Sequence, residues 1–219
     1  MQTMQIQMQL LEACRRLAGK GLLSTPADSL SMRIPGVQEM LLAATRGDWR
    51  RIGSDEMKIL STCCKDGGLH AAIYRTRADV GAVAISSPRG VQLLAGYGGA
   101  LPPVFDEQVR QIGSSVERIS YEASAGDAAV SRTFARGANA ALLGSQLLCL
   151  GMTCERVLLN TELYEKCARA YVIARASGGA IGRIPFWVRL IANRRLMKDE
   201  RRAASSYRDG RIPERVNAY

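Results

Sequence analysis

The chain has 219 residues, of which 47% are hydrophobic and 5% are aromatic, with 21 glycines. This composition excludes a disordered or fibrous protein and fits one mixed α/β domain with a buried core. The formal net charge of +10 favours anionic partners without naming their class. No apolar run reaches the roughly 20 residues of a membrane-spanning helix, and no export signal is present, so we expect a cytoplasmic protein.

Six cysteines are spread along the chain without a C-x-x-C pair, at positions 14, 63, 64, 149, 154 and 167. Their neighbours are mostly apolar, so we expect reduced and mostly buried thiols rather than disulfides. The adjacent Cys63 and Cys64 have no recognised ligand spacing. A structural or incidental role is therefore favoured for them over that of a nucleophile.

The first part of the chain predicts a helix followed by a hairpin. Apolar residues recur at helical spacing over residues 5–18, and the Gly19-Lys20-Gly21 run ends the pattern. Two short strand-like runs follow at 29–33 and 39–43, separated by the turn-forming pair Pro35-Gly36. We therefore expect these two strands to pair.

The middle of the chain predicts a helix, a buried strand and a second helix. Residues 68–78 repeat apolar side chains at helical spacing, and the apolar run at 80–85 is too short for a helix. Pro88 begins another helical stretch, which continues through Leu94 and ends at a glycine-rich turn.

The next segment predicts one helix, two strand edges and a second, longer helix. The first helix is expected over 127–138, and the runs 141–144 and 147–151 predict two strand edges or one bent strand. Thr153 is predicted to cap the long helix, whose pattern continues until Gly178.

We divide the chain into a domain at 1–179 and a basic C-terminal tail at 180–219. Ten Arg or Lys residues and four Asp or Glu residues lie between Arg183 and Tyr219. The apolar run 184–191 adds an amphipathic pattern, so we expect a helix that packs on the domain or on a neighbouring subunit. Binding to a membrane surface or to nucleic acid would fit the same pattern, and we favour it less.

Several spaced segments carry a resemblance to a known family: LLEACRRLAGKGLL, SLSMR, LHAAIYRTRADVGAV, LPPVFDEQVRQIG, LLCLG and TCERVLL. Together they resemble the class II aldolase/adducin family over roughly Leu10 to Ala176. The resemblance implies a three-layer α/β/α sandwich with a central mixed, largely antiparallel sheet. It also implies a homo-oligomer, expected to be a tetramer, whose sites lie between subunits and take a small-molecule ligand.

Enzymes of this family hold a zinc ion with an H-x-H-P pair and a third histidine in an N-H-G turn. The resemblance places these motifs on Ile85-Ser86-Ser87-Pro88 and on Gly144-Ser145-Gln146, so all three histidines are absent. Serine hydroxyls are poor zinc ligands, and an isoleucine side chain offers no donor atom. We therefore expect neither a metal nor another cofactor.

The same resemblance supplies the remaining candidate residues. The family's catalytic Glu falls on Asp66, four residues before His70, and its phosphate-binding turns fall on 28–31 and 44–47. An acid at Asp28 would repel a phosphate, and an arginine in the second turn would compensate for it. The resulting catalytic candidates are Asp66, Ser87, Ser145 and His70, and the substrate-binding candidates are Ser29, Ser31, Arg46 and Ser86.

Each candidate also has a structural explanation. His70 is the only histidine, and packing or hydrogen bonding explains a lone helical histidine well. Capping of the following helix explains Asp66, and decay of an unused site would leave the small residues Ser87 and Ser145. In related aldolases a C-terminal tyrosine donates a proton, a role that would fall on Tyr207 or Tyr219.

Two hypotheses about function remain. The first is a divergent class II aldolase-like protein that binds or transforms a small polar, anionic metabolite by lyase or isomerase chemistry without zinc. The second is a non-catalytic assembly or interaction module, as in the adducin branch of the family. The sequence leaves open whether the protein is an enzyme.

Overall fold

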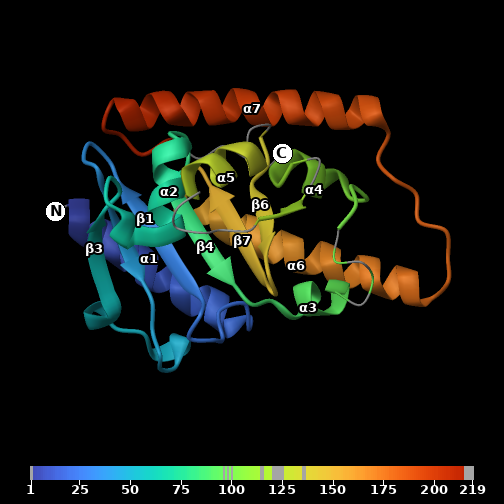
Figure 1. Ribbon diagram of the computed structural model, residues 1–219, viewed down its shortest axis with the longest axis horizontal. Coiled ribbons are helices and arrows are strands. Elements are labelled where there is room, and N and C mark those ends of the chain that lie inside the picture. The colour runs from blue at the N-terminus through green and yellow to red at the C-terminus, as the bar shows by residue number, and fades with distance from the viewer. Residues whose placement is uncertain are drawn as a thin grey trace.

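The computed structural model describes residues 2–95, 97, 99, 101–113, 116–119, 126–134 and 137–214. A seven-stranded sheet forms the middle of the molecule, and helices pack on both of its faces (Figure 1). The expected three-layer α/β/α sandwich is therefore confirmed.

The sheet has the strand order β3-β2-β1-β4-β7-β6-β5. Neighbouring strands are antiparallel except β5 and β6, which are parallel, so the sheet is mixed and largely antiparallel. The strands are β1 Ser29–Ile34, β2 Glu39–Ala43, β3 Met57–Ser61, β4 Ala82–Ser86, β5 Glu117–Arg118, β6 Ala140–Leu143 and β7 Gln146–Gly151.

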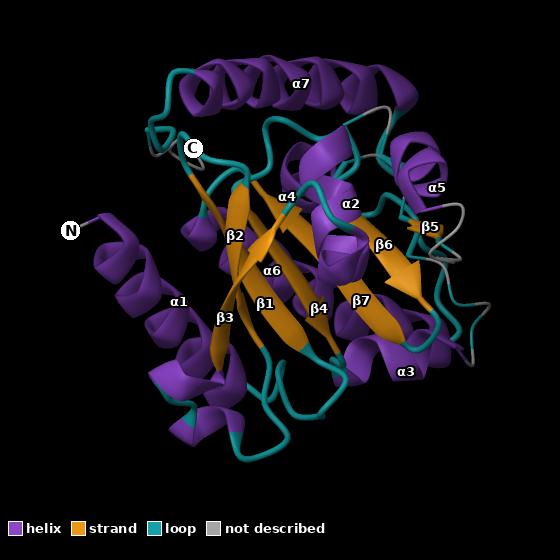
Figure 2. Cartoon of the chain, turned by 60° about the vertical axis from the view of Figure 1, so that its left-hand side comes forward, coloured by secondary structure: helices purple, strands orange, loops and turns teal. Residues whose placement is uncertain are grey.

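Two hydrophobic cores lie on the two faces of the sheet. Helices α1, α3 and α6 supply one core, and α2 and α5 supply the other (Figure 2). All five residues of β4 are buried, because alternate side chains of this strand enter opposite cores. The helices are α1 Gln2–Gly19, α2 Gly68–Thr76, α3 Arg89–Ala95, α4 Asp106–Gln111, α5 Gly126–Thr133, α6 Cys154–Ala176 and α7 Phe186–Arg208.

Most elements agree with the sequence pattern. The hairpin of β1 and β2 is confirmed, and so is the cap of α6, where the Thr153 side chain accepts a hydrogen bond from the Arg156 amide. Strand β3 was not expected, because it is an edge strand whose Lys58 and Ile59 are exposed, which obscures its apolar alternation. The helix expected over 127–138 already ends at Thr133.

All six cysteines are free, and four of them are buried, as expected. Cys63 and Cys64 are the two exposed thiols. Within the described ranges, no helix combines the length and apolar character needed to cross a membrane.

Helix α7 lies across the end of the sheet where β1 ends and β4 begins (Figures 1 and 2). Two ion pairs hold its inner face to the domain. Arg77 lies 3.0 Å from Glu200, and Arg110 lies 2.8 Å from Asp199. Both acids of the helix are therefore buried against cations of the domain.

Tyr207 makes a third attachment of α7. Its hydroxyl donates to the Met152 carbonyl at 2.8 Å, and the Arg33 guanidinium lies 5.5 Å from its ring centroid. Gly81 leaves the space that this ring needs, since a Cβ atom there would overlap the Tyr207 hydroxyl. Tyr207 is thus packed into the domain as an anchor of the helix.

Glu200 should make the stability of the protein depend on pH. Burial raises its pKa to about 7 against the attraction of Arg77, and the negative charge of Asp79 adds to the rise. Between its ordinary value of 4.5 and about 7, Glu200 holds a proton in the folded chain but not in the unfolded chain. Folding therefore gains stability from this group as the pH falls, and loses it as the pH rises through 7.

We expect Glu200→Gln to remove this contribution. The change in unfolding free energy between pH 8 and pH 5 should differ from that of the wild type by about 2–3 kcal/mol, measured by urea denaturation. Glu117→Gln is a matched control, because Glu117 is exposed on β5. Parallel pH profiles for Glu200→Gln and the wild type would show that Glu200 does not titrate in this range.

Candidate functional site

Polar side chains gather at one end of the sheet, where β1 begins, β4 ends and β7 begins. The antiparallel register pairs Ser29 with Ile85 and Ser86 with Leu147. The loop after β2 reaches the same end, because Ala43, the last residue of β2, pairs with the second residue of β1. The loops next to these strand ends therefore form one surface, which we call the polar end.

Asp28 is the centre of a hydrogen-bonded cluster at the polar end, although it is only 1% exposed. One carboxylate oxygen accepts from the amides of Ser24 and Thr25, at 2.7 and 2.8 Å. The other accepts from the Ser87 hydroxyl at 2.7 Å and from the Gln146 side-chain amide at 3.3 Å. Four donors therefore compensate the buried charge. We call these five residues the Asp28 cluster.

His70 organises a second set of side chains behind β1. Its Nε2 lies 2.8 Å from the Ser29 hydroxyl, and its Nδ1 lies 2.7 Å from the Ser31 hydroxyl. Ser31 in turn lies 2.8 Å from the Tyr74 hydroxyl. Burial lowers the pKa of His70 to about 4, so the imidazole is neutral at physiological pH. Because both ring nitrogens have partners inside the protein, His70 positions Ser29 and Ser31.

The serine candidates occupy different environments. Ser29 and Ser87 are half-buried at the polar end. Ser31 and Ser86 are fully buried, and the Ser86 hydroxyl points toward a main-chain carbonyl in β7 at 3.5 Å. Ser145 is exposed in the β6–β7 turn, and its hydroxyl bonds to no other described residue. The fold therefore brings Ser29 and Ser87 to one surface and does not join Ser145 to the Asp28 cluster.

Asp66 and Arg46 are both exposed. Asp66 lies in a short 3-10 turn before α2. The N-cap of α2 is Gly67, and no side-chain hydrogen bond caps this helix, so Asp66 is not its cap. In the described part of the chain, no hydrogen bond links Asp66 to Ser87 or Ser145. Arg46 lies in the loop after β2 at the polar end and forms no ion pair with a described residue.

Gln146 is a site residue that the sequence analysis did not select. Its amide also donates to the Ala27 carbonyl at 3.0 Å, so it ties β7 to the loop before β1. The signal for it was present, because Gly144 and Ser145 form a two-residue hairpin turn in which Gly144 has a φ of +61°. After such a turn, the next residue, Gln146, is the first residue of β7 and pairs with Leu143 of β6.

The residues that the resemblance places at the zinc positions do not fit a zinc ion. Ile85 is buried in the core, and the Ser87 hydroxyl already donates to Asp28. Ser145 lies in an exposed turn, and no hydrogen bond among the described residues joins its hydroxyl to this cluster. In the ranges that the structure describes, no group of three or more His, Cys, Asp or Glu side chains could hold a metal ion. The donor set is instead one of hydroxyls, an amide and a saturated carboxylate.

Tyr207 lies at the other end of the sheet in its own chain. It bonds to Met152, which follows the last residue of β7, whereas Gln146 is the first residue of that strand. Tyr207 therefore does not contribute to the polar end of the chain that carries it. Tyr219, the other tyrosine considered from the sequence, lies outside the described residues.

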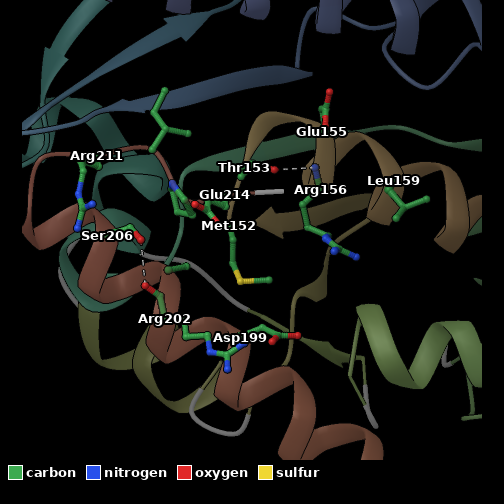
Figure 3. A pocket seen from close by; sticks show the side chains of 13 residues that line it. Met152, Thr153, Glu155, Arg156, Leu159, Asp199, Arg202, Ser206, Arg211 and Glu214 are labelled. Carbon is green, nitrogen blue, oxygen red and sulfur yellow. Dashed lines mark hydrogen bonds between the residues drawn. The ribbon is translucent and has the colours of Figure 1, made fainter. Parts of the chain in front are cut away.

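A cavity of about 550 Å³ also lies away from the polar end, between the start of α6 and the last turns of α7 (Figure 3). None of the candidate residues lines it. Its charged side chains are balanced between the arginines Arg156, Arg202 and Arg211 and the acids Glu155, Asp199 and Glu214. Asp199 is already paired with Arg110, and the other lining charges are of both signs.

Comparisons with known proteins agree with this architecture. L-fuculose 1-phosphate aldolase superposes with a TM-score of 0.74 at 18% identity, over 88% of this chain and 96% of that chain. An aldolase II superfamily protein from Pseudomonas syringae gives 0.72 at 18%, over 95% and 96%. L-fuculose-1-phosphate aldolase from Thermus thermophilus gives 0.65 at 19%, over 82% and 98%. At these identities the likeness shows the fold alone.

No curated protein sequence matches the chain. The family model of the class II aldolase and adducin N-terminal domain, however, matches residues 8–172, which is well over half of the sequence. The matched segment includes every strand of the sheet, the Asp28 cluster and His70. The chain therefore belongs to the class II aldolase/adducin family.

Proposed function

We propose that this protein binds or transforms a small polar, anionic metabolite at the polar end, without the zinc site of the family's enzymes. The observation that supports this most directly is the way two half-buried hydroxyls are held. Ser29 is anchored from behind by His70, and Ser87 is anchored by Asp28. A hydroxyl has one donor and two acceptor positions, so Ser29, whose hydroxyl contacts His70, keeps capacity for a ligand. The Ser87 hydroxyl also lies 3.4 Å from the Thr25 hydroxyl and 3.5 Å from the Gln146 amide, so a ligand would replace one of these two long contacts.

The charges at the polar end support an anionic ligand. The negative charge of Asp28 is buried and compensated by four donors. Arg46 is exposed on the adjacent loop and has no ionic partner among the described residues. A guanidinium binds carboxylates and phosphates through paired hydrogen bonds, so Arg46 would hold the anionic group while Ser29 and Ser87 bind hydroxyls.

Lyase or isomerase chemistry would further require an acid or base, and we assign that role to Asp66. In a single chain its carboxylate is open to solvent. A neighbouring subunit of a homo-oligomer, which we propose to be a tetramer in the cytoplasm, would cover it and complete the site. Exclusion of water would strengthen every charge interaction there.

One observation favours the second hypothesis, a non-catalytic assembly module. All four hydrogen bonds to Asp28 come from this chain itself, and both nitrogens of His70 are occupied. Such a closed network stabilises the fold without a ligand. Under the first hypothesis, Arg46 binds the ligand and Asp66 acts as an acid or base. Under the second hypothesis, neither residue has such a role.

Ligand binding separates them. We expect at least one compound from a panel of small sugar phosphates and hydroxy acids to bind the wild-type protein in isothermal titration calorimetry. Arg46→Ala should weaken that binding by about tenfold or more, because a charged hydrogen-bonded pair is lost. Arg175→Ala is a matched control, since Arg175 is an exposed arginine near the end of α6. Equal affinity for both variants would remove Arg46 from the site.

The acid or base role is tested on a compound that binds. If the protein transforms it, Asp66→Asn should lower kcat by about 100-fold or more while binding changes little. Failure of every compound to bind, together with normal assembly of Asp66→Asn and Arg46→Ala, would support the assembly module instead.

The Asp28 cluster makes a prediction that holds under either hypothesis. Ser87→Ala removes one donor from a buried carboxylate, so it should lower the unfolding free energy by about 1–3 kcal/mol. Ser145→Ala should change it by less than about 0.5 kcal/mol, because Ser145 is exposed and unbonded. Urea denaturation of the two variants provides the comparison, and similar values for both would contradict a structural role for the cluster.

A further inference from the structure

The outer face of α7 carries many cations and no acid. The helix contains only two acidic residues, Asp199 and Glu200, and both are buried against arginines of the domain. Its remaining charged residues are all cations, and none of them forms an ion pair within the described ranges. Arg189 is partly buried. The other six are exposed: Arg194, Arg195, Lys198, Arg201, Arg202 and Arg208. Arg202 also lines the cavity beside Glu155 and Glu214, so the outer face presents at least five cations without an ion-pair partner in the described part of the chain.

The first two turns of the same helix expose large apolar side chains. Phe186 is 69% exposed, Trp187 65%, Ile191 47% and Leu190 39%. Four-residue spacing links Trp187 to Ile191, and Leu190 to Arg194. The apolar patch thus continues directly into the cationic face, along a helix that forms the outermost layer of the molecule in both views (Figures 1 and 2).

We propose that this face docks on a surface of anionic lipid. The four apolar side chains enter the headgroup region, with Trp187 at the interface, and the arginines and lysine contact the headgroups. The helix would lie in the plane of the surface, which agrees with the absence of a membrane-crossing helix in the described part of the chain. This function of α7 is independent of the polar end.

The charges favour lipid over the other partners of such a face. A second copy of the chain that docked through the same face would bring two sets of at least five cations together, which is unfavourable. Nucleic acid would satisfy the cations but offers little to the aliphatic side chains of Leu190 and Ile191. The sequence pattern by itself favoured a subunit contact. The burial of Asp199 and Glu200 shifts the balance, because it leaves the outer face purely cationic.

Tryptophan fluorescence makes the test direct. The chain has two tryptophans, and Trp49 is only 3% exposed, so a change of emission reports mainly on Trp187. The full-length protein is mixed with vesicles of phosphatidylcholine, with or without phosphatidylserine. We expect co-sedimentation and a blue shift of the emission only with phosphatidylserine, and a loss of both as salt increases.

Two variants and one control separate the contributions. Arg194→Glu/Lys198→Glu should lower the partition coefficient by about tenfold or more, from the loss of attraction to the headgroups. Trp187→Ser/Ile191→Ser should also lower it and abolish the blue shift. The control Lys58→Glu/Arg175→Glu changes the net charge equally at exposed positions outside α7 and should retain binding. Circular dichroism confirms that each variant is folded.

Three outcomes would overturn the proposal. The first is a failure of charge-specific binding. Either the protein does not bind phosphatidylserine vesicles at low salt, or Lys58→Glu/Arg175→Glu loses as much binding as Arg194→Glu/Lys198→Glu. The second is an oligomer in sedimentation equilibrium that Trp187→Ser/Ile191→Ser dissociates, with emission insensitive to vesicles, which would make the face a contact with a second copy. The third is tight binding of a DNA duplex, measured by fluorescence anisotropy, without binding to vesicles.

Discussion

The antiparallel pairing of β4 with both β1 and β7 is the constraint on which the other features of this molecule depend. It brings the start of β1, the end of β4 and the start of β7 to one end of the sheet. The opposite ends of the same three strands then lie together under α7. One register therefore creates two separate surfaces, a polar end built around Asp28 and an end that is covered by the C-terminal helix.

The polar end illustrates how buried polar groups are satisfied in this fold. A buried charge must find donors, and Asp28 obtains them from two main-chain amides, a serine and a glutamine. A buried imidazole must be neutral and bonded, and His70 meets both conditions between Ser29 and Ser31. The same contacts that stabilise these groups also orient Ser29 and Ser87, so the structural network and the proposed binding surface share the same side chains.

Helix α7 separates its charges by sign. The acids face the domain, where Arg77 and Arg110 compensate them, and the cations face outward. Salt screens a buried ion pair only weakly, so the ion pairs that attach α7 to the domain should persist as the salt concentration rises. The exposed cations on the outer face are screened much more strongly. The arrangement attaches the helix firmly while leaving its outer surface available to an anionic partner.

Several spaced segments of the sequence determined the family by resemblance, and the family in turn implied the three-layer architecture. Most of the elements followed from periodicity, caps and turns, because these are local properties of the chain. The N-cap at Thr153 and the hairpin of β1 and β2 are examples. Only the tertiary structure decided which polar groups meet. Ser87 lies 59 residues from both Asp28 and Gln146 along the chain, and strand register joins all three. Edge strand β3 and the inward turn of Asp199 and Glu200 also depend on solvent exposure and long-range contacts, which no local pattern encodes.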